Sequence, residues 1–199
     1  MKKEPTARMQ QTQKRGFTLI ELFVVIGIFL VIISVTILSQ RSFDNSILID
    51  NLAYGIALAV REAQVYGVST RGFDTDFTSS YGVHFDTNEP NRFVLFADRD
   101  SIGRYDGDSI NDIEIFTLGT SGQITDVCRV EGGAVECGDT TGVDVSFIRP
   151  NPEPAFFFYD NDGNYDDDLE HSGAVIELTS PGGRVKTVQI GVTGQIVVE

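Results

Sequence analysis

The chain has 199 residues, of which 41% are hydrophobic, and its formal net charge at pH 7 is −14. This length leaves room for one domain of ordinary size plus an appendage. The first 16 residues carry five cationic side chains and one acidic one, so the other 183 residues hold an excess of 18 acidic side chains. A body this acidic disfavours nucleic acid as a partner, and it is typical of an exported domain or of one that binds cations.

A long uncharged segment follows the basic residues. Residues 22–40 contain no charged side chain and leave no polar face, so a helix here is predicted to lie in lipid or in a protein core. The segment is too long for the apolar part of a cleaved secretory signal, and no small-residue cleavage site follows it. A plain signal anchor explains the length and the basic flank. It leaves Glu21 unexplained, because a carboxylate in a bilayer costs about 2.5–3.5 kcal/mol.

The residues around this acid form a specific pattern, KRGFTLIE. Lys14 and Arg15 precede Gly16, Phe17 follows, and Glu21 lies four residues after Phe17. The pattern resembles the type III signal of type IV pilins and type II secretion pseudopilins. The resemblance implies that a prepilin peptidase cuts after Gly16 and that the new amino terminus at Phe17 is methylated. It also implies that the apolar helix is kept, first as a membrane anchor and later as part of a filament core.

Cleavage gives Glu21 a partner. The new ammonium group at Phe17 can pair with Glu21 of the same chain or of a neighbouring subunit, and paired charges need less solvation than isolated ones. The resemblance further implies contacts with other pilin or pseudopilin subunits, prepilin peptidase, an inner-membrane assembly platform and membrane lipid. It places the protein in the inner membrane with one span and an extracytoplasmic globular part, and then in a pilus or pseudopilus.

Helical periodicity continues past the apolar segment. Apolar residues recur every four positions from Leu48 to Val60, polar residues fill the other faces, and Gly67 stands where a C-terminal cap is expected. We therefore predict one helix from Phe17 to Tyr66. The predicted organisation is a leader over 1–16, an apolar helix half over 17–40, an amphipathic half over 41–67 and a globular β-rich domain over 68–199. No proline interrupts the helix, unlike in many major pilins, so the rank of the subunit stays open.

After residue 67 the apolar period shifts to two. Short alternating runs separated by glycine, proline and aspartate predict antiparallel strands. The runs cover residues 81–85, 92–98, 112–118, 143–148, 155–160, 174–180, 184–190 and 194–199. The predicted fold is α+β, with a long N-terminal helix packed on a C-terminal antiparallel β-sheet domain, as the family implies. Segments of the last third also show a weaker likeness to minor pilins and pseudopilins of the GspH and FimT type.

The two cysteines lie in the stretch CRVEGGAVEC. Folding it about Gly132 and Gly133 as a two-residue turn sets Arg129 opposite Glu136 and Cys128 opposite Cys137. In this register the cysteines occupy a non-hydrogen-bonded pair, whose Cα atoms lie about 4.5 Å apart, within the range of a disulfide. We predict a disulfide and an oxidising compartment. Two buried free thiols are the alternative.

Two loops concentrate acidic residues. In DNDGNYDDD, oxygen-bearing side chains alternate, so a turning loop can gather them around a hard cation such as Ca²⁺. These candidate ligands are Asp160, Asp162, Asn164, Asp166 and Asp168. The loop departs from the helix–loop–helix calcium pattern at Tyr165 and His171. A second loop offers Asp98, Asp100, Asp106, Asp108 and Asp112. For each loop taken singly the alternative is favoured, namely that these residues form turns and keep the surface soluble.

No catalytic motif is present. His84 and His171 have no nucleophile motif nearby, and the G-x-S-x-G and H-E-x-x-H patterns are absent. We therefore predict a non-enzymatic filament subunit with no required cofactor and Ca²⁺ as the candidate ligand. The rival from another class is a signal-anchored, Ca²⁺-dependent extracellular adhesin or binding module, and a membrane-tethered hydrolase is a third. Pilus and secretion pseudopilus, and major and minor rank, all fit the sequence.

Overall fold

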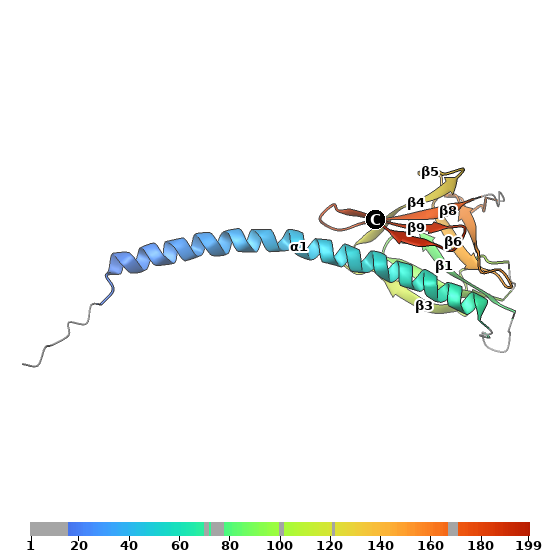
Figure 1. Cartoon of the computed structure of the whole chain (residues 1–199), viewed down its shortest axis with the longest axis horizontal. Helices are drawn as coiled ribbons and strands as arrows, with labels where there is room; N and C mark the ends of the chain where they lie inside the picture. The colour runs from blue at the N-terminus through green and yellow to red at the C-terminus, as the bar shows by residue number, and fades with distance from the viewer. Residues whose placement is uncertain (1–15, 70–71, 73–77, 100–101, 121, 167–170) are drawn as a thin grey trace, which may run out of the picture. The chain divides into compact units, whose positions relative to one another are not determined.

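The computed structural model describes residues 16–69, 72, 78–99, 102–120, 122–166 and 171–199, with only the backbone for residues 38–45. Of the predicted leader, only Gly16 falls in this range. The chain divides into two compact units, Met1–Arg41 and Ser42–Glu199, and we call the second one the head. The helix α1, Leu19–Val68, contributes to both units, and the strands lie in the head (Figure 1).

The first unit contains the anchor half of α1, residues 19–37. Every side chain of this half is exposed. The segment is long enough and apolar enough to span a membrane. Its hydroxyl groups turn back on the helix: Ser34 Oγ donates to the Leu30 carbonyl at 2.7 Å, and Thr36 Oγ1 donates to the Ile32 carbonyl at 2.9 Å. Because these donors are satisfied within the helix, the hydroxyls do not create a polar face.

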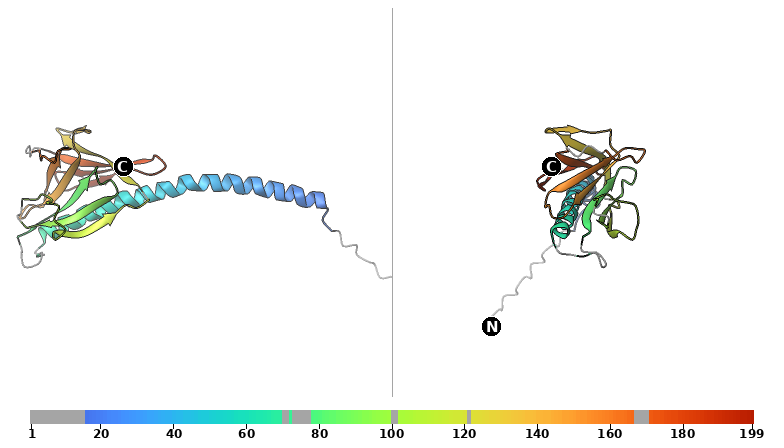
Figure 2. Two further views of the ribbon diagram at one scale, coloured as in Figure 1. Left: turned by 180° about the vertical axis from the view of Figure 1, so that it is seen from behind. Right: turned by 90° about the vertical axis from the view of Figure 1, so that its right-hand side faces the viewer.

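The head is built from two antiparallel sheets, which confirms the predicted α+β fold. The first sheet has the order β3-β2-β1-β6-β7, and the second has the order β10-β9-β8-β4-β5. The first sheet comprises β1 Ser80–Asp86, β2 Arg92–Asp98, β3 Asp112–Thr117, β6 Gly142–Phe147 and β7 Pro154–Tyr159. The second comprises β4 Gln123–Glu131, β5 Ala134–Glu136, β8 Gly173–Thr179, β9 Val185–Gly191 and β10 Ile196–Val198. Figure 2 shows these strands gathered around the second half of α1.

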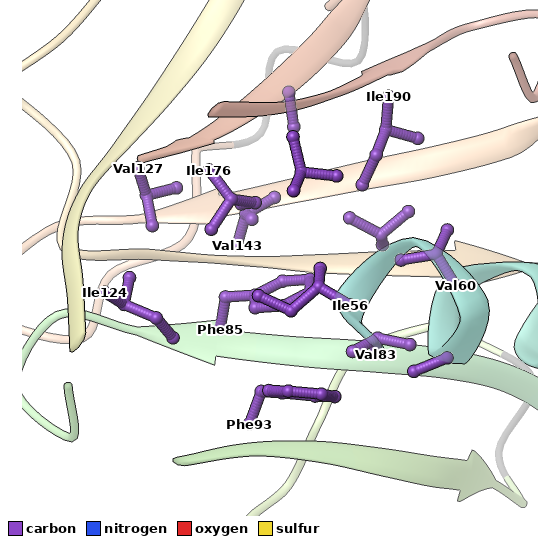
Figure 3. Close-up of a cluster of buried hydrophobic side chains, with 14 of the residues drawn as sticks. Ile56, Val60, Val83, Phe85, Phe93, Ile124, Val127, Val143, Ile176 and Ile190 are labelled. Atoms are coloured by element: carbon purple, nitrogen blue, oxygen red, sulfur yellow. The ribbon is translucent and has the colours of Figure 1, made fainter. Parts of the chain in front are cut away.

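The core lies between the two sheets and the head half of α1, residues 46–68. Ile56 and Val60 of the helix point into it, toward Phe85 of the first sheet and Ile190 of the second (Figure 3). All four side chains are fully buried, and burial of one such side chain contributes about 1.5–3 kcal/mol. The apolar residues that recur every four positions in the helix and every two positions in the strands therefore pack into one shared core.

The end of α1 differs from the sequence prediction. Gly67 is not a C-terminal cap, because the helix continues through Val68 and Gly67 keeps a negative φ. A Cβ atom at Gly67 would lie 2.5 Å from the Phe147 Cβ and 2.8 Å from the Phe147 carbonyl oxygen. Gly67 therefore permits close contact between helix and sheet. The cap comes from Arg149, whose Nε and Nη2 donate to the carbonyls of Gly67 and Tyr66 at 2.9 and 3.1 Å.

Two glycine substitutions in α1 test this close contact. We expect Gly67→Ala to lower the free energy of unfolding of the head by about 1–3 kcal/mol, because the new methyl group overpacks against β6. The matched control is Gly55→Ala, where a Cβ meets nothing within 4 Å and alanine should stabilise the helix by about 0.5–1 kcal/mol. Urea unfolding of the full chain in detergent, followed by tyrosine fluorescence, measures both changes. Equal effects would contradict the assigned role of Gly67.

Candidate processing and assembly site

The predicted cleavage point lies just before α1. Gly16, Phe17 and Thr18 form no helix or strand, and the helix begins at Leu19. The Phe17 side chain is 82% exposed, and no atom lies within 4 Å of the position that a Cβ on Gly16 would take. Among the described residues, the Gly16–Phe17 peptide bond therefore lies outside the helix in an exposed segment that a protease can reach.

Thr18 and Glu21 cap the first turn of α1. The Glu21 backbone N–H donates to Thr18 Oγ1 at 3.3 Å, and Thr18 Oγ1 donates to the Glu21 carboxylate at 3.5 Å. This arrangement is close to a capping box, in which a threonine N-cap pairs with a glutamate three residues later. Its sequence signal is the T-x-x-E pattern at residues 18–21, which was not among the predicted features. Glu21 thus lies at the positive end of the helix dipole, four residues after Phe17.

Residues 11–37 match the family of the prokaryotic N-terminal methylation motif. The chain carries the type IV pilin and pseudopilin signature. The matched residues include Lys14 and Arg15, the predicted cleavage point after Gly16, Glu21 and the anchor half of α1. No curated protein and no solved structure matches the chain. The pilin-type signature therefore describes the N-terminal region, and the head is characterised by its own geometry.

The predicted disulfide hairpin is present in the head. Cys128 and Cys137 are bonded, with their Cα atoms 4.3 Å apart. The β4–β5 ladder pairs Arg129 with Glu136 and Val130 with Val135, which is the predicted register. Gly132 and Gly133 connect the strands with φ angles of 55° and 89°, as a type I′ turn requires.

Arg129 is surrounded by acidic side chains from the hairpin and from the loop after β7. Its guanidinium nitrogens lie 3.3, 3.4, 3.5 and 3.9 Å from carboxylates. These belong to Glu131, Glu136, Asp166 and Asp139, respectively. His171 is buried beside the same group, with Nδ1 3.2 Å from Glu131 and Nε2 3.6 Å from Asp166. Arg129 therefore supplies a fixed positive charge to an acidic region.

The first acidic loop forms a turn in the structure. Asp160 Oδ1 accepts the backbone N–H groups of Asp162 and Asn164, both at 2.9 Å. Hydrogen bonds from Asn164 hold the pKa of the Asp160 carboxyl below its ordinary value. Among the described residues, Asp160, Asp162 and Asp166 form no group of three whose ligand atoms lie within 4.8 Å of one another. Asp168 lies outside the described residues, and a Ca²⁺ site in this loop stays a prediction.

The second acidic loop also uses its carboxylates internally. Asp98 accepts the backbone N–H of Gly103 at 2.5 Å, and Asp106 accepts that of Asp108 at 2.9 Å. Asp112 accepts the Tyr105 hydroxyl at 2.8 Å, whereas Asp100 lies outside the described residues. The Asp106 contact is that of a turn-forming aspartate, and a cation site in this loop stays a prediction.

Both acidic loops are tied to one buried carboxylate, Asp144 on β6. It is fully buried and accepts the Tyr105 backbone N–H at 2.9 Å and the Tyr165 hydroxyl at 2.8 Å. Its other oxygen lies 2.7 Å from His84 Nδ1. Tyr105 belongs to the second loop and Tyr165 to the first. Sequence analysis did not single out Asp144, since only the folded sheet brings these partners together.

Burial raises the pKa of three tyrosines around this carboxylate. Desolvation is the main cause in each case. A neighbouring carboxylate adds to the shift: Asp112 for Tyr105, Asp86 for Tyr159 and Asp144 for Tyr165. The Tyr159 hydroxyl donates to the Phe85 carbonyl at 3.1 Å. The hydroxyls of Tyr105, Tyr159 and Tyr165 donate these hydrogen bonds only while they keep their protons.

Reduction of the disulfide should measurably lower the stability of the head. It closes a short loop with a sequence separation of nine residues, and reduction should lower the free energy of unfolding of the head by about 2–3 kcal/mol. Urea unfolding with and without a phosphine reductant measures the loss. The control is the double variant Cys128→Ala/Cys137→Ala, whose unfolding should not respond to the reductant. An equal response of both proteins would refute the assignment.

We expect the head to lose stability at high pH because of these three tyrosines. Their folded pKa values are raised above 10.0, so the unfolded chain releases these protons first, and stability falls as the pH rises above about 10. One buried tyrosine contributes a slope of about 1.4 kcal/mol per pH unit. Tyr159→Phe should therefore flatten the dependence of unfolding free energy on pH between 10 and 11. An unchanged slope in this variant would exclude Tyr159 as a contributor.

Proposed function

We propose that the protein is a structural subunit of a type IV pilus or a type II secretion pseudopilus. It is made as a membrane-anchored precursor, cleaved after Gly16, methylated at Phe17 and assembled through helix packing. The observation that carries the proposal is the methylation motif at residues 11–37, continuous with a helix half that is apolar and exposed on every side. Such a helix needs lipid around it in the membrane and other helices around it in a filament.

The head half of α1 supports assembly through helices. Opposite its buried face, it leaves an apolar stripe exposed, with Tyr54 63% and Leu58 68% accessible. Ile47, Tyr54, Leu58 and Val65 are spaced by seven, four and seven residues, so they lie along one side of the helix. A stripe of this spacing is suited to pack against a helix of another subunit.

Glu21 supports the joining of subunits at the membrane end. Cleavage creates an ammonium group at Phe17, and Glu21 is the one acidic residue within the anchor half. In the described structure its carboxylate contacts only the Thr18 hydroxyl, so it can accept a second partner. We propose that this partner is the methylated amine of a neighbouring subunit, since each buried charge then has its counterion.

The proposed location is the inner membrane, with the head outside the cytoplasm. The Cys128–Cys137 disulfide supports this side, because disulfides persist in oxidising compartments. The proposed partners are other pilin or pseudopilin subunits, prepilin peptidase and the inner-membrane assembly platform. Pilus and pseudopilus differ in the machinery that they need, so complementation of pilus formation and of protein secretion in deletion strains separates them.

The N-terminus and Glu21 provide the decisive experiment. We expect mass spectrometry of the mature chain to find N-methylated Phe17 as the first residue. We expect Glu21→Ala to be cleaved normally and to reduce filament yield at least tenfold, because the paired charge is lost.

Glu89→Ala, a surface substitution in the head, serves as the control and should assemble normally. An uncleaved N-terminus would overturn the proposal in favour of a signal-anchored binding module. Wild-type assembly of Glu21→Ala would refute the charge pairing alone.

A further inference from the structure

The two sulfur atoms of the Cys128–Cys137 disulfide lie in different surroundings. Cys128 is 2% exposed and forms a small apolar cluster with Val130 and Val175, on the face of β4 opposite the core residue Val127. Cys137 follows β5 and is exposed. Within the described part of the head, a nucleophile from solvent therefore has access to Cys137, whereas Cys128 is covered.

Two carboxylates share this face of the sheet with the disulfide. Asp126 lies two residues before Cys128 on β4, and its cross-strand partner on β8 is Glu177. A carboxylate oxygen of Asp126 and the two sulfur atoms all lie within 4.8 Å of one another. Among the described residues, neither Asp126 nor Glu177 forms an ion pair, so the negative charge beside the disulfide is not neutralised there.

The arginine of the hairpin lies on the other face of β4. Arg129 alternates with Cys128 along the strand, and its Nε lies 3.3 Å from Glu131 and 3.4 Å from Glu136. Its positive charge is therefore compensated on its own side of the sheet. The disulfide face is acidic by contrast, because Asp126 and Glu177 are the charged side chains that the β4–β8 ladder sets beside Cys128.

We propose that this disulfide is a site of thiol exchange, in which Cys137 accepts the incoming sulfur and Asp126 selects against anionic thiols. In the reaction, a small-molecule thiolate forms a bond to Cys137 Sγ and the Cys128–Cys137 bond breaks. Cys128 leaves with the electron pair as a thiolate and takes a proton from water. The incoming thiol is oxidised to a mixed disulfide on Cys137, and Cys128 is reduced to a thiol.

The surroundings of the disulfide oppose this reaction for anionic thiols in particular. The attacking, central and leaving sulfur atoms share one negative charge, and Asp126 lies beside two of them. The leaving thiolate of Cys128 forms in the apolar cluster, where a charge is poorly solvated. A thiol with additional carboxylates is repelled further, whereas an ammonium group on the thiol is attracted to Asp126. The favoured reactants are therefore cationic thiols.

Reduction rates of the full chain in detergent test the selection by charge. Glutathione serves as the anionic thiol and cysteamine as the cationic one, each at the same pH with the wild-type chain and with Asp126→Asn. At low ionic strength we expect Asp126→Asn to raise the glutathione rate roughly three- to fivefold, because a unit charge close to the sulfur atoms is removed. The cysteamine rate should change less than about 1.5-fold, because the lost repulsion of its thiolate is offset by the lost attraction of its ammonium group.

Three further measurements make the test specific. Sodium chloride at about 0.5 M should reduce the glutathione effect to less than about half, because it screens the charge. Asp126→Glu keeps the charge and should retain the wild-type rates. Glu114→Gln, which removes an exposed carboxylate from β3 in the other sheet, should leave both rates unchanged.

Equal acceleration of both thiols by Asp126→Asn would show that the substitution opens the hairpin, and it would overturn the role of Asp126. A glutathione effect no larger than that of Glu114→Gln, or a raised glutathione rate in Asp126→Glu, would overturn it too.

Peptide mass spectrometry identifies the sulfur atom that is attacked. After brief exposure to glutathione, acid quenching and alkylation, we expect glutathione on Cys137 at least about tenfold more often than on Cys128. Equal labelling of the two cysteines would overturn the assignment of Cys137. None of these outcomes bears on cleavage after Gly16, so the filament subunit proposal is tested separately.

Discussion

The structure depends on one constraint, which is that a single helix must meet two different environments. The anchor half of α1 is apolar on every side, whereas the head half is apolar on a buried face and along a narrow exposed stripe. The backbone is satisfied by the same hydrogen-bond pattern in both, so only the side chains change. The head can therefore be exposed to water while it stays joined to an apolar segment whose exposure to water is unfavourable. The disulfide and the loops affect the stability of the head without altering this division.

Much of this organisation could be predicted from the sequence, because it is encoded locally. The uncharged run predicted the anchor half, the four-residue period predicted the head half, and alternation predicted most strands. The hairpin is the clearest case. Two glycines fix the turn, the turn fixes the register, and the register sets Cys128 opposite Cys137.

The remaining features arise from contacts between distant residues. Gly67 was read as a cap because glycine often ends a helix, yet its position is explained by Phe147, which lies 80 residues later. Asp144 is the one charged residue in strand β6, and two of its partners, Tyr105 and Tyr165, lie on loops that no sequence spacing relates to it. Arg129 shows the same limit for the acidic region. Its guanidinium lies 3.3 Å from Glu131 and 3.5 Å from Asp166, two carboxylates that are 35 residues apart in the chain.

The Asp144 carboxylate has a consequence for how the surface of the head can vary. Because one buried group holds Tyr105 and Tyr165 together, the two acidic loops are not independent parts of that surface. A substitution that displaces one loop releases an acceptor on which the other relies, so the effects of changes in the two loops should not be additive. The buried Asp144 carboxylate thus limits which substitutions the surface loops tolerate. Two segments about 60 residues apart in the chain can change in sequence only in ways that keep their shared contact.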